Sequence, residues 1–411
     1  MTWRSVAGAV LAACLVVLSD CPGAEEKAAK EAAGTIQYLP LGAAAGTSQA
    51  VVVQGFPLVH TRQLLPLDRQ GKLVGEGDVD KQIEQVLTNL EAVLKASGSG
   101  LGKLVRVNVY ALSPTTVSRA YELLGKRLDP AVRPAVTSVL TTMTYRKALV
   151  ALDAVAISDN GAKSVALKRC EEVAGDKECA DVAVLPRGGV AYLSGQPDEG
   201  GLTVSAVAKS MSNLMKTMGH LKLSPQQVVQ LKVFLNPATA ADDVLRELKK
   251  TFAGQLLPPV VFVEWLAAVP VEIELIAQWP LSGKASENVE YFTPPEVRPA
   301  PTFSKVALVE TERQIYISTV FASKPSRGEP QAKLVFEQLQ KILKETGSDL
   351  RHLAKATYYV SDNDAARWID RTRSTIYDPT RPPAASKVTV HGVGQAERTM
   401  SVDVIAVRAG K

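Results

Sequence analysis

The chain repeats one pattern of amphipathic helix and alternating strand three times, and this repetition limits the folds that it can adopt. Helical stretches recur at a near-constant interval around Asn89, Asn213 and Gln338. Each is followed by an alternating strand, in the segments LVRVNVYALS, VVQLKVFLNP and LAKATYYVSD. Because one supersecondary unit of about 100 residues recurs, we expect three tandem copies of a single module.

The composition of the 411 residues is that of a globular protein. A hydrophobic content of 46% beside 22% charged residues leaves enough apolar surface to build cores. The formal net charge is +5, but Lys and Arg are scattered among acidic residues without a basic stripe. The charge pattern therefore argues against nucleic acid as a partner.

The first residues have the pattern of an export signal. Arg4 precedes an almost wholly apolar run from Val6 to Leu18. We expect residues 1–24 to be a signal peptide and residues 25–45 a polar spacer, with the protein exported to the bacterial periplasm or cell surface. The apolar run is too short for a transmembrane helix, and no other stretch approaches the required length, so no membrane span is expected.

Two early cysteines keep a lipoprotein interpretation open. Cys14 follows a Leu-Ala-Ala segment but lies inside the apolar run. Cys21 is better placed, although Asp20 occupies a position where lipoprotein signals carry a small uncharged residue. Cleavage near Gly23 or Ala24 is the preferred interpretation, and a lipid anchor at Cys21 is the alternative.

Cys170 and Cys179 lie close together in a polar segment between the first two modules. In an oxidising compartment two such thiols commonly form a disulfide, which we expect here, with reduced thiols as the alternative. Their spacing matches no zinc pattern and the four His are dispersed, so no metal site is expected.

Polar and proline-rich segments divide the chain. The linker with Pro294, Pro295 and Pro299 is typical of a boundary that few contacts cross. The expected order after the spacer is module 1 at residues 46–159, a connector at 160–181, module 2 at 182–281, the Pro-rich linker at 282–300, and module 3 at 301–411.

Every module shows the same order of elements. It begins like a β-hairpin and continues with an amphipathic helix, a strand, a second helix ended by proline, and two further strands. Ile83, Val86 and Leu90 fall on one helical face, whereas Val105 and Val107 alternate with polar residues at the period of a strand. We expect an α+β module with helices on one face of a sheet.

The SGQ segment at residues 194–196, a proline turn and the final strand VEIELIA make the second module resemble the reactive intermediate deaminase family. This family is also called Rid, YjgF or endoribonuclease L-PSP, and the other two modules resemble it more loosely. The resemblance implies chorismate-mutase-like modules, each a β-sheet with two helices. Family members are usually homotrimers with clefts between subunits, so three fused copies imply a monomeric, single-chain pseudo-trimer.

The resemblance also implies a chemistry. Active members hydrolyse imines or enamines derived from amino acids, without a metal or organic cofactor. An arginine after the proline turn binds the substrate carboxylate, a glutamate on the last strand activates water, and the serine of the SGQ-like segment helps to bind.

This chain departs from the family pattern at the arginine. Val136, Val260 and Ala385 occupy the three arginine positions. An aliphatic group cannot pair with a carboxylate, and burying that carboxylate unpaired would cost several kcal/mol. We therefore expect all three carboxylate-binding arginines to be lost, and no guanidinium to reach the seams between modules.

The other family positions survive unevenly. The glutamate position holds Glu272 in module 2, but Ala151 and Ser401 in the other modules. The serine position holds Ser194, Ser318 and Thr61. Only module 2 keeps both, so the candidate catalytic residues are Glu272 and Ser194, and the candidate ligand-binding residues are Gly195, Gln196, Ser318, Thr61, Arg133 and Arg381.

Each candidate also has a structural interpretation. Glu272 could be a surface acid on a terminal strand, and Gly195 could serve backbone geometry alone. Arg133 and Arg381 precede proline and could replace the missing clamp or be solvated. Asp153, Glu274 and Asp403 recur at one acidic position in all three modules, which indicates a packing or interface role.

Two hypotheses for function follow. In the first, the protein is an exported pseudo-trimer that binds a small metabolite or acts as a scaffold, having lost imine hydrolysis. In the alternative, it is a 2-imino or enamino acid deaminase that works at the one cleft containing Glu272 and Ser194. A ribonuclease activity has little support, because the chain shows no basic groove or aromatic stacking platform.

Overall fold

The computed structural model describes residues 34–198 and 203–410, in which the strands form three six-stranded sheets. The predicted signal peptide, Cys14 and Cys21 lie outside the described residues. None of the helices in the described ranges is both long and apolar enough to cross a membrane.

Sheet 1 and sheet 2 have the same strand order. Sheet 1 runs β5-β4-β6-β3-β8-β7 and sheet 2 runs β11-β10-β12-β9-β14-β13. Sheet 1 comprises β3 (Leu58–Thr61), β4 (Leu104–Ala111), β5 (Ala135–Leu140), β6 (Val150–Ile157), β7 (Ala166–Lys168) and β8 (Val182–Leu185). Sheet 2 comprises β9 (Gly189–Asp198), β10 (Val228–Leu235), β11 (Val260–Glu264), β12 (Val271–Trp279), β13 (Val289–Phe292) and β14 (Val306–Val309).

Sheet 3 repeats this order with strands from both ends of the described chain. It runs β17-β16-β18-β15-β2-β1. Its members are β15 (Arg313–Val320), β16 (Leu353–Val360), β17 (Ala384–Thr389), β18 (Met400–Ala406), β1 (Thr35–Leu39) and β2 (Ala50–Gln54). Each sheet therefore takes four strands from one module and two edge strands from the segment that leads into the next module around the ring.

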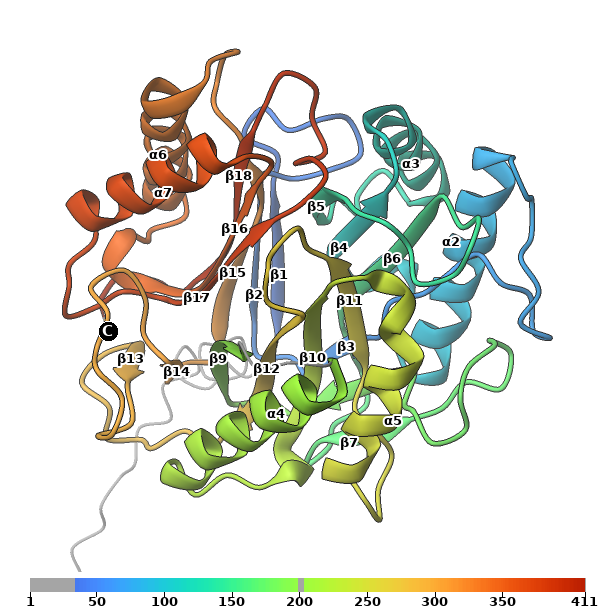
Figure 1. Cartoon of the computed structure of the whole chain (residues 1–411), viewed down its shortest axis with the longest axis horizontal. Helices are drawn as coiled ribbons and strands as arrows, with labels where there is room; N and C mark the ends of the chain where they lie inside the picture. The colour runs from blue at the N-terminus through green and yellow to red at the C-terminus, as the bar shows by residue number, and fades with distance from the viewer. Residues whose placement is uncertain (1–33, 199–202, 411) are drawn as a thin grey trace, which may run out of the picture. The chain divides into compact units, whose positions relative to one another are not determined.

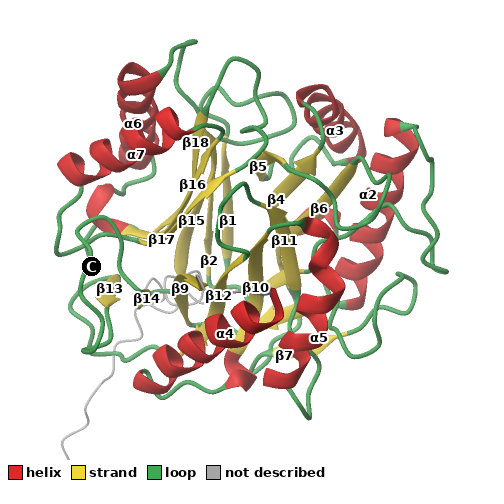
Figure 2. Cartoon of the chain, viewed as in Figure 1, coloured by secondary structure: helices red, strands yellow, loops and turns green. Residues whose placement is uncertain are grey.

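Two helices cover one face of each sheet, as predicted. They are α2 (Val79–Ala96) and α3 (Pro114–Arg127) in module 1, α4 (Thr203–His220) and α5 (Ala241–Thr251) in module 2, and α6 (Gly328–Glu345) and α7 (Asn363–Ile376) in module 3. Short 3-10 turns lie at Leu101–Lys103, Pro225–Gln227, Ala238–Ala240 and Leu350–His352. Figures 1 and 2 show the helix pairs at the periphery and the strands between them.

Local sequence signals account for the helices. Asp78, Ser113 and Asp362 each precede a helix, and their side chains accept a hydrogen bond from the backbone N–H three residues later. Pro114 occupies the first turn of α3, where its missing N–H costs nothing. The predicted apolar face of α2 is confirmed, since Ile83 and its neighbours at helical spacing are buried against sheet 1.

The expectation that each module starts with a β-hairpin is wrong. β2 pairs with β1 and β15, and β3 pairs with β6 and β8, so these consecutive strands lie in different sheets. The same holds for β8 and β9, and for β14 and β15. Alternating strands joined by a short turn look like a hairpin in sequence, but equivalent strands of a neighbouring module offer the same hydrogen bonds.

Exchange of these strands closes the ring. β2 pairs antiparallel with β15, with Ala50 opposite Ile317 and Gln54 opposite Arg313. The spacer strand β1, the connector strand β7 and the linker strand β13 occupy equivalent edges of the three sheets. The single-chain pseudo-trimer is confirmed, with each seam between modules bridged by backbone hydrogen bonds.

The polar faces of the strands meet where the three sheets face one another. All eight residues of β4 are buried, because the Val107 face lies under the helices and the Arg106 face lies toward the other sheets. An apolar cluster that includes Val51, Val105 and Tyr192 fills part of this interface. The predicted alternation is correct from Arg106 onward, although the polar side does not face solvent. It is wrong at Val105, because a bulge between Leu104 and Arg106 turns this side chain to the interface.

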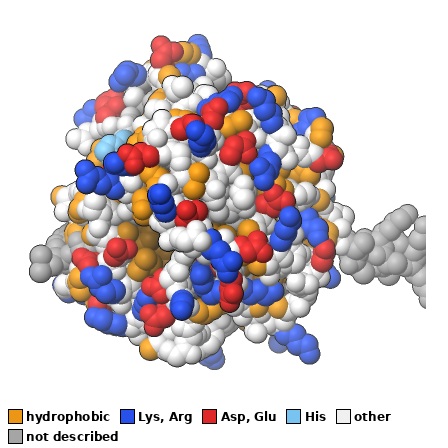
Figure 3. Space-filling view, turned by 90° about the vertical axis from the view of Figure 1, so that its right-hand side faces the viewer, with side chains coloured by type: hydrophobic (Ala, Val, Ile, Leu, Met, Phe, Trp, Pro, Cys, Tyr) orange, Lys and Arg blue, Asp and Glu red, His pale blue; other side chains and the backbone are white. Residues whose placement is uncertain are grey.

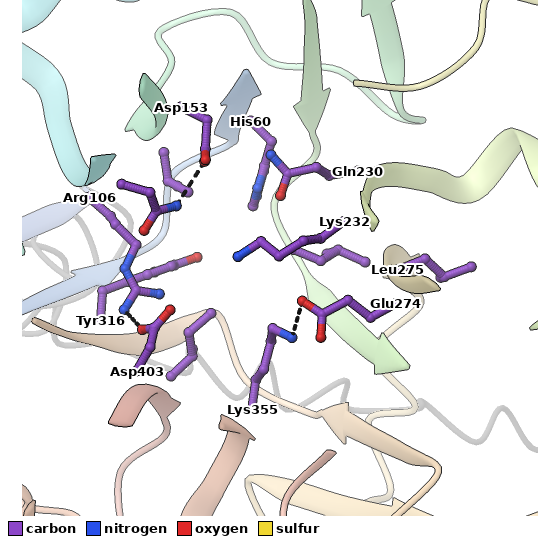
Figure 4. Close-up of a pocket in the computed structure, with 14 residues that line it drawn as sticks. His60, Arg106, Asp153, Gln230, Lys232, Glu274, Leu275, Tyr316, Lys355 and Asp403 are labelled. Atoms are coloured by element: carbon purple, nitrogen blue, oxygen red, sulfur yellow. Dashed lines mark hydrogen bonds and ion pairs between the residues drawn. The ribbon is translucent and has the colours of Figure 1, made fainter. Parts of the chain in front are cut away.

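Charged side chains from the three sheets meet at their common interface, and two ion pairs cross it (Figure 4). Arg106 of sheet 1 forms an ion pair with Asp403 of sheet 3 and donates to the Ile317 carbonyl at 2.6 Å. Lys355 of sheet 3 lies 2.6 Å from Glu274 of sheet 2.

Lys232 of sheet 2 and Asp153 of sheet 1 lie in the same interface without a direct ion pair. Burial raises the pKa of Asp153, against the charge of Lys232, and the carboxyl accepts hydrogen bonds from Asn108 at 2.8 Å and Tyr110 at 2.6 Å. The predicted interface role of the recurring acids is thus confirmed. Such pairs are costly to break, because losing one partner leaves a buried charge uncompensated, at about 3–5 kcal/mol.

We predict that ring closure can be tested with a disulfide. In a chain without native cysteines, Gln54→Cys with Arg313→Cys should oxidise to an intramolecular disulfide, because directly opposed strand residues lie within disulfide range. The measurement is the mobility shift on non-reducing gels. Gln54→Cys with Arg187→Cys, which places the second thiol after β8, is the matched control; equal cross-linking of both pairs would contradict the strand exchange.

Candidate functional site

In two of the three seams between modules, the serine position of one module lies against the arginine position of the next. We name the seam of modules 1 and 2 the first cleft, that of modules 2 and 3 the second cleft, and that of modules 3 and 1 the third cleft. In the third cleft Ser318 Oγ accepts a hydrogen bond from Val136 N–H at 2.7 Å. In the second cleft Ser194 Oγ accepts one from Ala385 N–H at 2.7 Å.

Both serine hydroxyls also use their proton within the seam. Ser318 Oγ donates to the Ser48 carbonyl at 2.6 Å, and Ser194 Oγ donates to the Ser304 carbonyl at 2.5 Å. In the first cleft the strand registers place Arg62 at the serine position, which corrects the assignment of Thr61. Thr61 Oγ1 instead accepts a hydrogen bond from Ala154 N–H at 2.9 Å and donates to the Arg62 carbonyl at 3.0 Å. These hydroxyls hold neighbouring strands together, so the proton of Ser194 is committed before any substrate binds.

The third cleft contains a cavity of about 390 Å³ beside Val136 and Ser318. Its other walls come from the loop between β1 and β2, from α3, and from the loop around Gly394. Hydroxyl and amide groups line it, and none of the residues that line it is charged. The lining includes Tyr121, which the sequence analysis did not single out.

The first cleft contains a second cavity, of about 330 Å³, beside Val260. Phe262, Leu65 and Tyr145 give it apolar walls, and the carboxylates of Asp176 and Asp242 also line it. Val260 therefore lines an open space and does not fill the cleft.

The expectation that no guanidinium reaches a seam is wrong. Arg62 lines the first-cleft cavity, and Arg106 crosses between sheets 1 and 3. Neither occupies an arginine position of the family. Arg62 is tied down by Asp181 at 2.7 Å and by the carbonyls of Gln63 and Ala174 at 2.9 and 2.5 Å. Sequence reasoning missed both residues because each partner lies far away along the chain.

The second cleft holds the candidate carboxylate. Glu272 on β12 is only 8% exposed, and its side chain lies against Gly195 on β9, where any Cβ would overlap the carboxylate. This contact explains the glycine of the SGQ segment. Glu272 is therefore not a surface acid, and the structural interpretation made from sequence is corrected.

Burial and charge tune this carboxylate. Burial raises the pKa of Glu272 to about 7, with the nearby Glu274 charge adding to the shift, while Ser386 and the charges of Lys355 and Lys305 oppose it. Burial also lowers the pKa of Lys305, against the attraction of Glu272. A carboxyl that titrates near neutral pH can act as a general base or acid.

Lys305 was not among the residues predicted from sequence. It follows Ser304 at the start of β14, and Gln49 holds the equivalent place after Ser48. Aligning the three copies of the module at this position would have revealed the lysine beside the candidate glutamate. Gln196, predicted as a ligand contact, is half-buried, and its side-chain amide lies 3.4 Å from the Ser194 carbonyl.

The two arginines predicted as replacement clamps lie away from the cavities. Arg133 is exposed and donates to the Pro130 carbonyl at 3.2 Å. Arg381 stacks on Tyr291, with 5.3 Å from its Cζ to the ring centroid, and donates to the Val289 carbonyl at 3.2 Å. Arg133 is held within its own turn, whereas Arg381 of module 3 is held against β13 of sheet 2, and neither contact places the arginine in a cavity described above.

The predicted disulfide is absent. Cys170 and Cys179 are free and buried, and they pack into different cores, those of modules 1 and 2. Burial raises the pKa of the Cys179 thiol to about 11, which keeps it protonated. Proximity in sequence misled the prediction, because the connector runs between two cores and delivers one thiol to each.

The centre of the ring contains a small polar cavity of about 30 Å³ among the paired charges (Figure 4). His60 points into it, and neither ring nitrogen of His60 has a hydrogen-bond partner. Burial lowers the pKa of His60 to about 4, so the ring is neutral at physiological pH. The space suffices for about two water molecules. Within the described ranges, no group of three or more His, Cys, Asp or Glu could hold a metal ion.

Comparison with known proteins identifies the family. The sequence model described as endoribonuclease L-PSP matches residues 40–158 and 295–408, more than half of the chain. The chain belongs to the endoribonuclease L-PSP family. The matched segments cover modules 1 and 3 with a few adjoining residues of the spacer and the linker, whereas the motifs of clearest resemblance lie in module 2. The family and the repeated Rid-like fold are confirmed.

Several proteins of about one module in length align with part of the chain. The RutC family protein slr0709 of Synechocystis and Protein DfrA of Myxococcus xanthus are each 33% identical over 111 residues, which is 27% of this chain and 84% of each relative. Among solved structures, the Rid protein YyfB of Yersinia pestis is 25% identical over 30% of this chain and 98% of its own, with a TM-score of 0.26. A putative endoribonuclease of Thermotoga maritima is 28% identical over 30% and 92%, with a TM-score of 0.23.

We predict that deprotonation of Glu272 lowers the free energy of unfolding as the pH rises. Because its folded pKa lies above the ordinary value, the folded state keeps a proton that the unfolded chain loses between about pH 4.5 and 7. The stabilising contribution is complete below this window and is lost through it, on the order of 3 kcal/mol. Glu272→Gln should remove this part of the pH dependence in urea unfolding, measured from pH 4.5 to 8.

The control for this prediction is Glu337→Gln, which removes an exposed carboxylate of α6. The pH profile of this variant should follow that of the wild type. An unchanged profile for Glu272→Gln would mean that the Glu272 carboxyl does not titrate in this window.

Proposed function

We propose that the protein is an exported, monomeric member of the endoribonuclease L-PSP family that binds small molecules in the clefts between its modules and has lost the family's carboxylate anchor. The observation that carries the proposal is the pair of open cavities, of about 390 and 330 Å³, beside Val136 and Val260. Both volumes fall in the range of small-molecule sites. A protein that served only as a scaffold would gain stability by filling these spaces.

The chemistry at the arginine positions supports binding without the family's reaction. Val136, Val260 and Ala385 offer only backbone groups, and the Val136 and Ala385 N–H groups already donate to Ser318 and Ser194. A carboxylate placed there would lose its hydration without gaining an opposite charge. The third cleft therefore does not bind substrates through their carboxylate group, because the residues that line its cavity are uncharged.

Export supports a ligand-binding role outside the cytoplasm. The Arg4 and apolar Val6–Leu18 pattern is the basis for this part of the proposal, with a lipid anchor at Cys21 as the alternative. The surface argues against nucleic acid, because Figure 3 shows Lys and Arg side chains interspersed with Asp and Glu on the face that it displays.

We predict that the first-cleft cavity binds a small neutral aromatic molecule. Saturation-transfer NMR of the full chain with indole should show binding, and Val260→Trp should abolish it because the larger ring occupies the cavity. Leu266→Trp, which adds the same ring at an exposed position nearby, is the matched control. Indole binding that survives Val260→Trp, or that is absent in the wild type, would contradict the proposal for this cleft.

One observation favours a second candidate function, imine hydrolysis at the second cleft. Glu272 has a pKa of about 7, and Lys305 supplies a positive charge beside it. In this candidate, Glu272 removes a proton from water, the water oxygen adds to the C=N carbon, and the nitrogen leaves as ammonia, so that imine and water give a carbonyl compound and ammonia.

The activity assay separates the two candidates. With 2-imino acids generated in situ by an amino-acid oxidase and trapped by semicarbazide, our first proposal predicts no acceleration of imine loss. The second candidate predicts a rate that rises through pH 7 and falls at least about 100-fold in Glu272→Gln. Ser401→Ala, at the equivalent position of module 3, is the matched control and should not change that rate.

A further inference from the structure

The third cleft differs from the second cleft in chemistry, although the strand registers of the two clefts are equivalent. Strand registers place Gln49 where the second cleft has Lys305, and Ser138 where it has Lys387. They also place Ser401 at the position of Glu272. Three positions that are charged in the second cleft thus carry a neutral hydroxyl or amide group in the third cleft.

Hydroxyl groups face the third-cleft cavity from several elements. Tyr121 and Ser118 come from α3, Ser138 from β5, and Thr319 from β15. The Tyr121 hydroxyl forms a hydrogen bond with the Ser138 side chain, and burial raises the pKa of Tyr121 to about 12. The phenol therefore remains neutral and can both donate and accept hydrogen bonds at physiological pH.

The cavity also has an apolar side. Val117, Val136 and Phe321 line it together with the hydroxyl groups. Gly394 closes the cavity at the module 3 side, with a φ of +85° and a position so close to Ser138 that a Cβ would overlap the serine hydroxyl. The site is thus built from apolar and neutral hydrogen-bonding surface in combination.

We propose that the third cleft binds an uncharged polyhydroxylated molecule with the dimensions of one sugar ring. This inference rests on the proposed small-molecule binding and names the ligand class for one cleft. The C–H face of such a ring packs against Val136 and Phe321, and its hydroxyls exchange hydrogen bonds with Tyr121 and the Gln49 amide. A charged ligand is rejected because no opposite charge lines the cavity.

The test compares neutral and charged ligands of one size. Titration calorimetry or saturation-transfer NMR would use D-glucose, D-galactose, D-mannose and myo-inositol, against D-glucuronate and D-glucosamine. At least one neutral compound should bind saturably, and each charged compound should bind at least about tenfold more weakly than it. Absence of saturable binding by every neutral compound would overturn the inference, as would tighter binding of a charged one.

Variants locate the site. Tyr121→Phe should weaken neutral binding about fivefold by removing one hydroxyl. Tyr291→Phe makes the same change at a hydroxyl that bonds the Arg351 and Leu353 carbonyls, and should have no effect. Neutral binding that is insensitive to Tyr121→Phe would place the ligand elsewhere and contradict the proposal.

A variant that should gain binding provides a test that loss of folding cannot mimic. Gln49 is half-buried, and Gln49→Lys introduces the charge that the second cleft carries at Lys305. This variant should gain D-glucuronate binding by about tenfold or more over the wild type. If all sugars fail while indole still binds in the first cleft, only this inference fails; if indole fails as well, the proposed function fails with it.

Discussion

The structure depends on the exchange of edge strands around the ring. β2, from the first segment of module 1, completes the sheet of module 3, and β8 and β14 do the same for the sheets of modules 1 and 2. Separating any two modules would expose a row of unpaired backbone groups along a sheet, which water would solvate but which would also offer a template for aggregation. The seams are therefore as well ordered as the sheets themselves, and the clefts that lie along them inherit that order.

Charge pairing at the centre of the ring adds specificity to this exchange. The ion pairs of Arg106 with Asp403 and of Lys355 with Glu274 join sheet 3 to the other two sheets, and the charge of Lys232 acts on Asp153 between sheets 2 and 1. Burial raises the pKa of Glu274, but the charges of Lys355 and Lys232 outweigh it and hold that pKa below its ordinary value. Buried pairs of this kind contribute little net stability, yet they penalise any arrangement that leaves one charge alone.

Fusion of the copies allows the clefts to differ. In a homotrimer a substitution appears at all three interfaces, whereas here it appears at one. The cavity of the first cleft combines apolar walls with Arg62, Asp176 and Asp242, the second cleft contains Glu272 and Lys305, and the cavity of the third is uncharged. One fold thus presents three chemically distinct seams.

Much of this architecture could be predicted from the sequence, and the failures share a cause. The repeat period, the apolar face of α2, the family, and the interface role of Asp153, Glu274 and Asp403 were readable because each is a local pattern that recurs in every copy. The strand pairing at the start of each module could not be predicted, because the backbone of β2 can form the same hydrogen bonds with β3 or with β15. The disulfide failed similarly, since the distance from Cys170 to Cys179 along the chain says nothing about which core receives each thiol.

The candidate site shows the same division. The sequence by itself determined that the arginine positions are aliphatic and that one glutamate and two serines survive, since identity at a motif position is a property of the chain. Only the tertiary structure decided that the Ser194 hydroxyl donates to the Ser304 carbonyl and that Val136 and Val260 line open cavities. It also decided that Glu272 is buried against Gly195 beside Lys305. Hydrogen bonds, pKa shifts and cavities arise between groups that are distant in sequence, and closure of the ring is what places them together.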